Sequence, residues 1–539
     1  MRRAVQNGCV RRWDGAHSQI QAREVSTFRP QERSERAHQH QRGHQDAAVF
    51  VTAKPDGATV NSNGIRFRAV RFVALAALAF AASPARADRL WTASDQGVIG
   101  VSAEQLDAKF WIDRLAQPDR VLLDQPSILD QNARLQHVDP SLHDLRALPA
   151  ELSRKQVAGW IEALSERPTR TLYDASGKAV DERTIDALIA ALALDAIPAR
   201  RPARYGLIVQ RANLRTFPTH LRVFSTQGDT DIDRFQETAL FPGVPVVIAH
   251  ESADRQWWFV VAQRYAAWVE KIQVAEGSAK QVFEYADKTP YRIVTGASVG
   301  TVFTPEQPML SALRLDMGTR VPVLGNWPAA DPVNGQHPYT SHVIELPLRG
   351  SDGGLRLAPA LLQKNADTRS DYLPLTRANV LRQAFKFLGE RYGWGHSYDA
   401  RDCSGFVSDV YASMGVLMPR NTRDQSISPG LAHRTFGLAD ERAARMAAVR
   451  ALEVGDLVYI PGHVMMAIGA IDGEPYVIHD TTGLSYRDAG GKRIRVDLNG
   501  VSVSPLTPLL FNDHELYVDR MTSIVRIASV PDKQAPNPQ

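Results

Sequence analysis

Cysteine is nearly absent from this sequence, since its 539 residues contain only Cys9 and Cys403. A framework of several disulfides is therefore excluded. Long apolar runs are also missing, because no stretch reaches the roughly 20 residues that a membrane-spanning helix needs. The formal net charge is only +4, which gives no indication of a nucleic-acid partner. We expect neither stable membrane insertion nor nucleic-acid binding.

One shorter apolar run near the N-terminus has the features of an export signal. Arginines between positions 66 and 71 precede about a dozen apolar residues, and Ala85-Arg86-Ala87 resembles a cleavage site. Residues 66–87 are predicted to be a signal peptide; the alternative is a buried core helix. Residues 1–65, rich in Arg, Gln and His, are predicted to lie outside the mature protein. We expect a periplasmic or secreted chain that starts near Asp88.

Such a mature chain keeps Cys403 as its single thiol. Exported proteins use most of their cysteines in disulfide pairs. A lone cysteine therefore suggests a reactive thiol or a bridge between molecules. The alternative is a small, buried apolar side chain.

The pattern of apolar residues changes three times along the chain. Residues 88–202 are predicted to be mostly helical, whereas 203–276 and 277–368 consist of short β-rich runs, typical of small barrels or sandwiches. Residues 369–530 begin with an amphipathic helix, at about 377–390, and continue into three β runs. This order predicts a multidomain α+β protein. Helices are expected at 102–115, 152–166 and 180–194.

Apolar residues after Cys403 recur at helical spacing. Phe406, Val410 and Met414 follow one face, so a helix should begin near Cys403 and end at Gly415. A thiol at a helix N-terminus faces unpaired N–H groups and the positive end of the helix dipole, which favour the thiolate. The neighbouring Asp402 and Ser404 are candidates for capping this helix as well as for binding a substrate.

A cysteine nucleophile needs a base, and His463 and His479 are the candidates. Each could instead be a structural histidine. Side chains alternate along a strand, so a two-residue turn at Asp472-Gly473 would place the two imidazoles on opposite faces of the hairpin. A three- or five-residue loop, or a bulge, would place them on one face. The catalytic interpretation requires one of these irregularities.

Three stretches together resemble the NlpC/P60 cysteine peptidases: "RYGWGHSYDARDCSGFVSDVYASMGVLMPRNTRDQ", "GDLVYIPGHVMMAIG" and "YVIHD". The resemblance covers about Leu373 to Arg526. It implies a papain-like α+β catalytic domain, preceded by a helical stabilising domain and two bacterial SH3-like barrels. In that family the activity is cleavage of cell-wall peptides, typically between γ-D-glutamate and an L-diamino acid.

The resemblance also implies a role for each matching residue. Cys403 would be the nucleophile, His463 the general base, and His479 the group that orients it, with Tyr392 beside the nucleophile helping to stabilise the oxyanion. The free amino group of an N-terminal L-Ala would be bound by Asp402, Ser404, Arg420 and Thr422. No metal or cofactor is implied, and the partners would be peptides derived from peptidoglycan.

The sequence departs from the family pattern at a few positions. His396 replaces a usual Gly, which would add bulk near the entrance, Asp480 replaces a small residue, and Thr422 stands where Ser is frequent. Two other readings stay open: a murein amidase or acyltransferase of the same superfamily, and a cell-wall binding protein without activity. The diamino acid and the oligomeric state are not indicated by the sequence.

Overall fold

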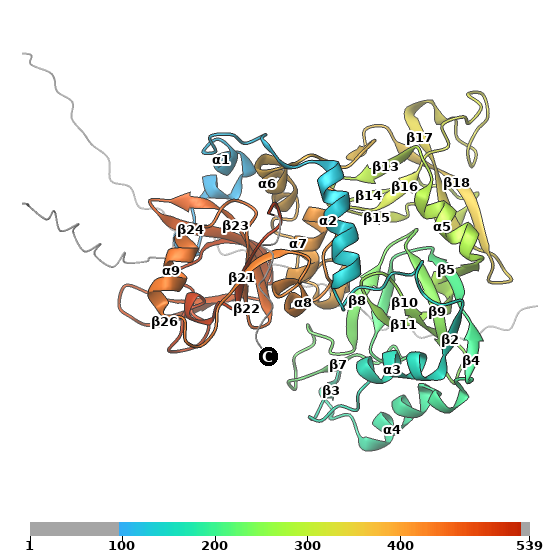
Figure 1. The fold of residues 1–539 in the computed structure, drawn as a ribbon, viewed down its shortest axis with the longest axis horizontal. Coiled ribbons are helices and arrows are strands. Elements are labelled where there is room, and N and C mark those ends of the chain that lie inside the picture. Colours follow the sequence, from blue (N-terminus) through green and yellow to red (C-terminus); the bar gives the residue numbers. More distant parts are fainter. Residues whose placement is uncertain (1–95, 530–539) are drawn as a thin grey trace, which may run out of the picture. The chain divides into compact units, whose positions relative to one another are not determined.

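The computed structural model describes residues 96–529, which belong to one of the two units into which the chain divides, residues 84–539. Cys9, residues 1–65 and the signal peptide expected at 66–87 lie outside the described residues. Helical, β-rich and mixed regions follow one another along the ribbon (Figure 1). The expected multidomain α+β class is confirmed, whereas the domain boundaries stay predictions.

The N-terminal helices complete the cores of two other regions. They are α1 (Ala108–Ile112), α2 (Gln125–Val138), α3 (Arg154–Leu164) and α4 (Glu182–Ala191). Trp111 of α1 and Ile128 of α2 enter the core of the C-terminal region. Ile161 of α3 and Ile185 of α4 enter the core of the first β-rich region. The helices at 152–166 and 180–194 are thus confirmed.

The helix expected at 102–115 is split. The backbone N–H of Ser102 donates to Gln105 Oε1 at 2.7 Å, which completes the capping box. A 3-10 turn follows, and α1 begins only after Asp107, whose carboxylate accepts from the Lys109 N–H at 2.8 Å. Asp107 provides a second N-cap, so the helix starts again there.

The first β-rich region forms one seven-stranded antiparallel sheet. In spatial order its strands are β12 (Val274–Gly277), β5 (Arg204–Ile208), β9 (Pro245–Glu251), β10 (Trp257–Val261), β11 (Ala266–Glu270), β6 (Ala212–Arg215) and β8 (Gln236–Leu240). Alternate side chains of β10 enter different cores. Trp257 and Phe259 face a core that contains residues of α3 and α4, and Trp258 and Val260 face the other. Both faces of this strand are therefore covered.

The second β-rich region combines helix α5 (Ala279–Asp287) with three small antiparallel sheets. Their strands are β16 (Arg320–Pro322), β13 (Tyr291–Val294) and β19 (Thr368–Arg369); β14 (Ser298–Gly300) and β15 (Arg314–Asp316); β17 (Ser341–Arg349) and β18 (Leu355–Gln363). Val294, Leu315 and Ile344 come from different sheets and pack in one core. The sheets therefore behave as one packed region.

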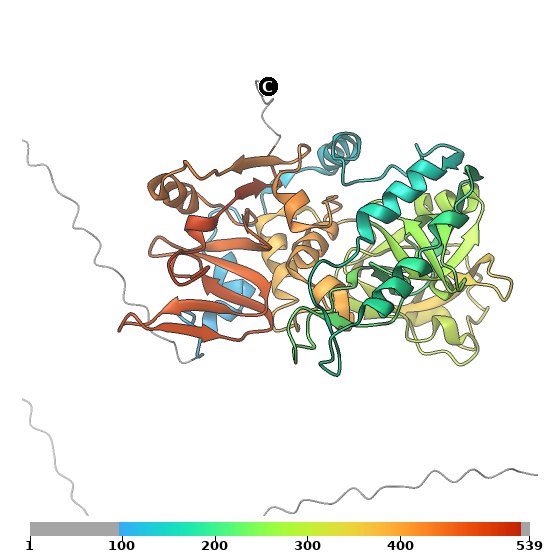
Figure 2. The same ribbon diagram turned by 90° about the horizontal axis from the view of Figure 1, so that it is seen from below.

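The C-terminal region is built around a six-stranded antiparallel sheet (Figures 1 and 2). Its strands, in spatial order, are β21 (Ala432–Thr435), β28 (Ser523–Arg526), β22 (Leu457–Ile460), β23 (His463–Ile471), β24 (Glu474–Thr481) and β27 (Gly500–Pro505). Its helices are α6 (Arg377–Phe385), α7 (Cys403–Ala412), α8 (Thr422–Ser426) and α9 (Arg442–Arg450). The three predicted β runs are β22, β23 and β24, which confirms the predicted order.

Helices α7 and α9 cover opposite faces of this sheet (Figure 1). Val464 and Met466 of β23 pack in the core that contains α7, while Met465 packs against the core that contains Val449 of α9. Helix α6 ends at Phe385, before the expected position 390. Turns with i→i−3 hydrogen bonds follow it, up to Gly389, whose φ is 81°.

Candidate active site

Cys403 is the first residue of α7, as its sequence environment predicts. The Asp402 carboxylate caps the helix by accepting from the Gly405 N–H at 2.8 Å. The Ser404 hydroxyl donates to the same carboxylate at 3.0 Å. Gly415, whose φ is 83°, follows the end of the helix. The predicted helix and the capping role of Asp402 are therefore confirmed.

The thiol itself does not behave as its position suggests. Cys403 is buried, with only 5% of the residue exposed. Burial, and next the negative charge of Asp402, raise the pKa of the Cys403 thiol to about 12, although the backbone N–H of Val464 donates a hydrogen bond to the sulfur. Desolvation thus outweighs the helix N-terminus. The expectation that this position favours the thiolate is wrong for the resting protein.

The hydrogen bond from Val464 places the thiol beside the start of β23, one residue after His463. Helix α7 packs against β23 and β24. The strand that carries the candidate base therefore adjoins the helix that carries the candidate nucleophile.

The β23–β24 hairpin brings His463 and His479 to one face of the sheet by means of a bulge. Its turn has two residues, Asp472 and Gly473, both with positive φ. The ladder shifts between Ala467 and Gly469, and beyond the shift Met466 pairs with Ile478. A bulge is one of the irregularities that the catalytic interpretation requires. His463 Nε2 lies 2.8 Å from His479 Nδ1.

Ser504 extends this pair into a line of three polar groups. Its hydroxyl oxygen lies 3.0 Å from His479 Nε2, and both Ser504 and His479 are 0% exposed. Sequence reasoning missed Ser504 because β27 was not identified as the neighbour of β24. The alternation in "GVSVSP" was the available signal for that strand.

Burial keeps both imidazoles neutral. It lowers the pKa of His463 to about 4. It lowers the pKa of His479 well below the ordinary value, and the neighbouring His463 adds to the effect. The Cys403 thiol, whose pKa is raised, is also neutral in the resting protein.

Tyr392 lies close enough to the thiol for the two groups to affect each other electrostatically. Burial, followed by the charges of Cys403 and Asp402, raises the pKa of Tyr392 well above its usual value. Its phenol thus stays protonated and can donate a hydrogen bond. Asp480 also acts on Tyr392 and Cys403, and burial raises the pKa of Asp480 well above its usual value. Asp480 is therefore one more group that opposes a thiolate at Cys403.

Arg420 gathers the residues expected to bind a substrate amine. Its Nη2 donates to Asp402 Oδ2 and its Nη1 to Ser404 Oγ, both at 2.7 Å. The cluster is buried, and the Arg420 charge helps to lower the pKa of Asp402 against its desolvation. Thr422 begins α8, and within residues 96–529 none of the hydrogen bonds of Arg420 reaches it.

His396 belongs to this cluster rather than to an entrance. It is buried, and its Nδ1 accepts from Arg420 Nη2 at 2.9 Å. Arginine can only donate, so the neutral ring carries its proton on Nε2. Burial, followed by Arg420 and other nearby arginines, lowers the pKa of His396 well below its usual value. The expected extra bulk near the entrance is therefore a buried acceptor for Arg420.

Strand β8 of the first β-rich region forms one wall of the cluster. Thr238 Oγ1 accepts from Arg420 Nε at 2.6 Å. Gln236 Nε2 donates to the Gly395 carbonyl at 2.8 Å, and Trp394 Nε1 donates to the Gln236 carbonyl at 3.1 Å. The sequence did not reveal these contacts, because they join positions more than 150 residues apart.

The residue before Asp402 is the centre of a second buried ion cluster. Arg401, which is fully buried, donates to Asp409 at 2.7 Å, to Glu390 at 2.8 Å and to Asp316 at 3.1 Å. Asp316 belongs to the second β-rich region and also accepts from Arg211 of the first at 2.7 Å. Three regions of the chain therefore hold the backbone that precedes the thiol.

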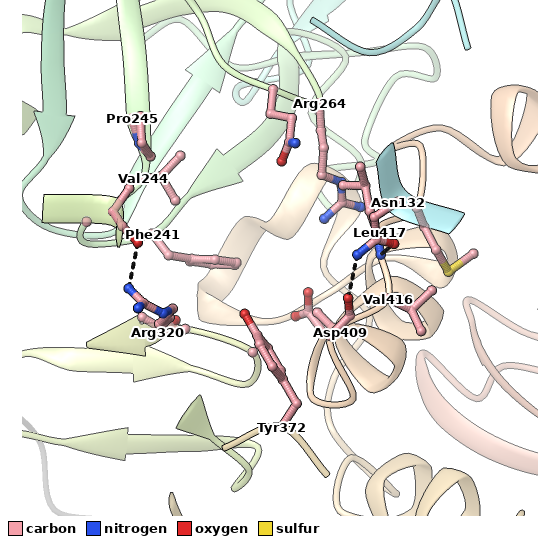
Figure 3. Close-up of a pocket in the computed structure, with 18 of the residues that line it drawn as sticks. Asn132, Phe241, Val244, Pro245, Arg264, Arg320, Tyr372, Asp409, Val416 and Leu417 are labelled. Carbon is pink, nitrogen blue, oxygen red and sulfur yellow. Dashed lines mark hydrogen bonds between the residues drawn. The ribbon is translucent and has the colours of Figure 1, made fainter. Parts of the chain in front are cut away.

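A cavity of about 590 Å³ lies at the other end of α7 (Figure 3). Phe241 and Arg320 lie on one side, and Asp409, Val416 and Leu417 on the other. Its lining does not include the thiol or either histidine of the pair. This cavity is therefore separate from the candidate active site.

Two searches of residues 96–529 concern other kinds of site. No group of three or more His, Cys, Asp or Glu side chains there could hold a metal ion. No helix in that part of the chain is long and apolar enough to cross a membrane.

Comparisons with known proteins agree with this geometry. The model of the NlpC/P60 family matches residues 389–502, and the model of the SH3 domain of SH3b1 type matches residues 222–270. The first match includes Cys403, His463 and His479, and the second includes β8. The resemblance seen in the sequence motifs is confirmed: the chain carries an NlpC/P60 domain and an SH3 domain.

One solved structure shows a similar fold over most of the chain. An NlpC/P60 endopeptidase from Photobacterium damselae subsp. piscicida is similar with a TM-score of 0.63 and 15% identity, over 79% of this chain and 98% of that one. An NlpC/P60 family protein from Bacillus cereus ATCC 10987 has a TM-score of 0.40 and 21% identity, over 60% and 100% of the two chains. No curated protein matches this sequence.

Proposed function

We propose that this chain, which carries an NlpC/P60 domain and an SH3 domain, is a cysteine endopeptidase of the cell wall. Its substrates are murein peptides with a free N-terminal L-Ala, and it cleaves the bond between γ-D-glutamate and the L-diamino acid. The observation that carries the proposal is the hydrogen-bonded His463–His479 pair on the strands that pack against α7, the helix headed by Cys403.

Because the thiol and the imidazoles are neutral at rest, the reaction begins with a proton transfer. His463 Nδ1 takes the proton from the Cys403 sulfur as the sulfur attacks the γ-glutamyl carbonyl carbon. The Cys403 N–H and the Tyr392 phenol stabilise the oxyanion that forms. His463 then gives the proton to the leaving amine of the diamino acid. Water, deprotonated by the same imidazole, hydrolyses the thioester and regenerates the thiol.

The Arg420 cluster supports recognition of a free amino group. Asp402 keeps its negative charge because Arg420 lowers its pKa, and Ser404 supplies a hydroxyl beside it. Thr238 and Gln236 extend this polar wall from the SH3 domain. A wall at this position favours short peptides over the intact polymer, because a longer N-terminal extension would meet β8.

The remaining parts of the chain fit the same proposal. Residues 277–368 would be a second SH3-like barrel. Residues 88–202 would be a helical stabilising domain, since the helices of this N-terminal region complete two neighbouring cores. Residues 66–87 would direct export, and the protein would work in the periplasm or outside the cell, where its substrate occurs.

The test is digestion of the tripeptide L-Ala-γ-D-Glu-diaminopimelate by the purified protein, followed by mass spectrometry of the products. We expect L-Ala-D-Glu and free diaminopimelate. Cys403→Ala should remove turnover and leave the circular dichroism spectrum unchanged. Turnover that survives Cys403→Ala would exclude the thiol mechanism.

Two further substrates separate the alternatives. The same peptide with an acetylated N-terminus should be cleaved poorly, because its amine carries no charge for Asp402. A muropeptide with its lactyl amide intact should keep that bond. Release of the whole peptide from the sugar would instead identify an amidase.

A further inference from the structure

The two hydrogen bonds between His463, His479 and Ser504 form one linked system. His463 Nε2 lies 2.8 Å from His479 Nδ1, and His479 Nε2 lies 3.0 Å from Ser504 Oγ. A neutral imidazole carries one ring proton and presents one bare nitrogen. The proton on His479 therefore occupies one of these two hydrogen bonds, and the other needs a donor from the neighbouring residue. The direction of the hydrogen bond between Ser504 and His479 thus decides which ring nitrogen of His463 carries its proton.

Only one of the two arrangements gives a base. If His479 donates from Nε2 to Ser504, its Nδ1 accepts from His463 Nε2–H, and His463 Nδ1 is bare. If Ser504 donates to His479 Nε2, His479 Nδ1–H donates to His463 Nε2, and the proton of His463 moves to Nδ1. In the second arrangement the nitrogen that is left for the thiol already carries a proton and cannot accept another.

We propose that Ser504 is a positioning residue that sets the tautomers of His479 and, through it, of His463, by accepting the Nε2 proton of His479. This inference rests on the proposed cysteine peptidase function and adds a residue to it. Ser504 does not touch the thiol. It acts two hydrogen bonds away, on the nitrogen that receives the thiol proton.

The burial of Ser504 and His479 allows Ser504 to set the tautomers of the two imidazoles. Ser504 and His479 are both fully buried, so water does not offer His479 Nε2 another acceptor. Both imidazoles are neutral because burial lowers their pKa values, and the thiol keeps its proton because burial raises its pKa. A doubly protonated imidazole would have no tautomer to set, whereas a neutral imidazole depends on it.

A matched control lies on the same strand. Ser502 faces the same side of β27 as Ser504 and pairs with His479 in the ladder, but its hydroxyl donates to the Gly500 carbonyl at 3.1 Å. Ser502→Ala removes a hydroxyl from the same sheet face without removing the acceptor of His479. It should leave both the tautomers and kcat/KM unchanged.

The direct test is nitrogen NMR of the full-length protein labelled with ¹⁵N-histidine, at neutral pH and without substrate. The signals are assigned by their loss in His463→Gln and His479→Asn. We expect both rings protonated on Nε2 in the wild type and in Ser504→Thr. In Ser504→Ala the proton of His463 should appear on Nδ1 in part or all of the molecules. A wild-type His463 protonated on Nδ1 would overturn the inference, whether or not any variant folds.

The kinetic test uses a double-mutant cycle with the tripeptide substrate. Ser504→Ala should lower kcat/KM about 10- to 100-fold, in line with a buried donor that loses its acceptor. Asn at position 479 can place its amide oxygen where the histidine has Nδ1, and this oxygen accepts from His463 without help from Ser504. Adding Ser504→Ala to His479→Asn should therefore cost less than threefold. An equal loss in both backgrounds would mean that Ser504 merely packs the sheet.

The two proposals fail in different ways. If the wild type does not cleave the peptide, the proposed function fails, and the NMR measurement still reports the tautomers. If the wild type cleaves it but Ser504→Ala leaves both the tautomers and kcat/KM unchanged, the role of Ser504 is refuted and the peptidase function stands.

Discussion

His463 Nε2 and His479 Nδ1 lie 2.8 Å apart, although a regular two-residue hairpin would put the two rings on opposite faces of the sheet. The bulge between Ala467 and Gly469 changes the register by one residue and removes this conflict. Trp111 of α1 packs on this bulge, so that a helix far back in the sequence supports the arrangement of the two histidines.

Gly469→Ala should damage activity through the bulge. Gly469 has a φ of 145°, and an added Cβ would lie 3.0 Å from Trp111 Cε3. Adopting this backbone costs an alanine about 1–3 kcal/mol, and relaxing the strain would disturb the histidine register. We expect kcat to fall at least tenfold, measured with the tripeptide. Gly490→Ala, in an exposed turn where φ is not positive, is the matched control, and an equal loss there would contradict the explanation.

The pH dependence of kcat/KM should follow a neutral base. The active form needs an unprotonated His463, whose pKa is lowered to about 4, so activity should be lost only as the pH falls towards that value. The Cys403 thiol, with its pKa raised to about 12, should add no alkaline limb below that pH. A profile measured with a stable buffer series checks both limbs. An acid limb at the ordinary imidazole value would indicate a thiolate–imidazolium pair instead.

Arg420→Ala should destabilise the protein as well as inactivate it. The change leaves the buried Asp402 carboxylate without its cation, and breaking a buried pair in this way costs about 3–5 kcal/mol. Urea unfolding followed by circular dichroism measures the loss. The exposed Arg423 of α8 offers the control, since Arg423→Ala should change stability by less than about 0.5 kcal/mol. Equal effects of the two changes would refute the buried pairing.

Thr238→Val tests the wall that the SH3 domain provides. The valine keeps the shape but removes the oxygen that accepts from Arg420 Nε at 2.6 Å. Hydrogen bonds to charged groups contribute about 1.5–3 kcal/mol, so Arg420 should be less firmly placed. We expect KM for the free tripeptide to rise about tenfold or more with kcat changed less than threefold. Thr226→Val, at an exposed position, should change neither constant.

Local patterns in the sequence predicted much of the C-terminal region. The spacing of Phe406, Val410 and Met414 predicted α7 and its start at Cys403, and the three β runs became β22, β23 and β24. These elements follow from periodicity, caps and turn residues, which act over a few positions. The strand β27, which carries Ser504, was not recognised, because Ser504 and its partner His479 lie 25 positions apart in the chain.

The electrostatic prediction for the thiol failed for a related reason. A helix N-terminus is visible in the sequence and favours a thiolate, but the burial of Cys403 and the way Asp402 faces it are not visible there. Desolvation is a property of everything that packs around a group, and here it dominates. The same holds for His396, whose neighbour Arg420 lies 24 positions away.

The sequence by itself identified the groups that would carry the proposed chemistry, namely the Cys403 thiol at the head of a predicted helix and two histidines on predicted strands. Only the tertiary structure decided how the groups around them are arranged. It did so with one extra residue in β23, with the wall of β8, and with Ser504 on a strand beside His479. The physical reason is range: helix caps and alternation act between near neighbours, whereas register, burial and proton placement depend on contacts between distant segments.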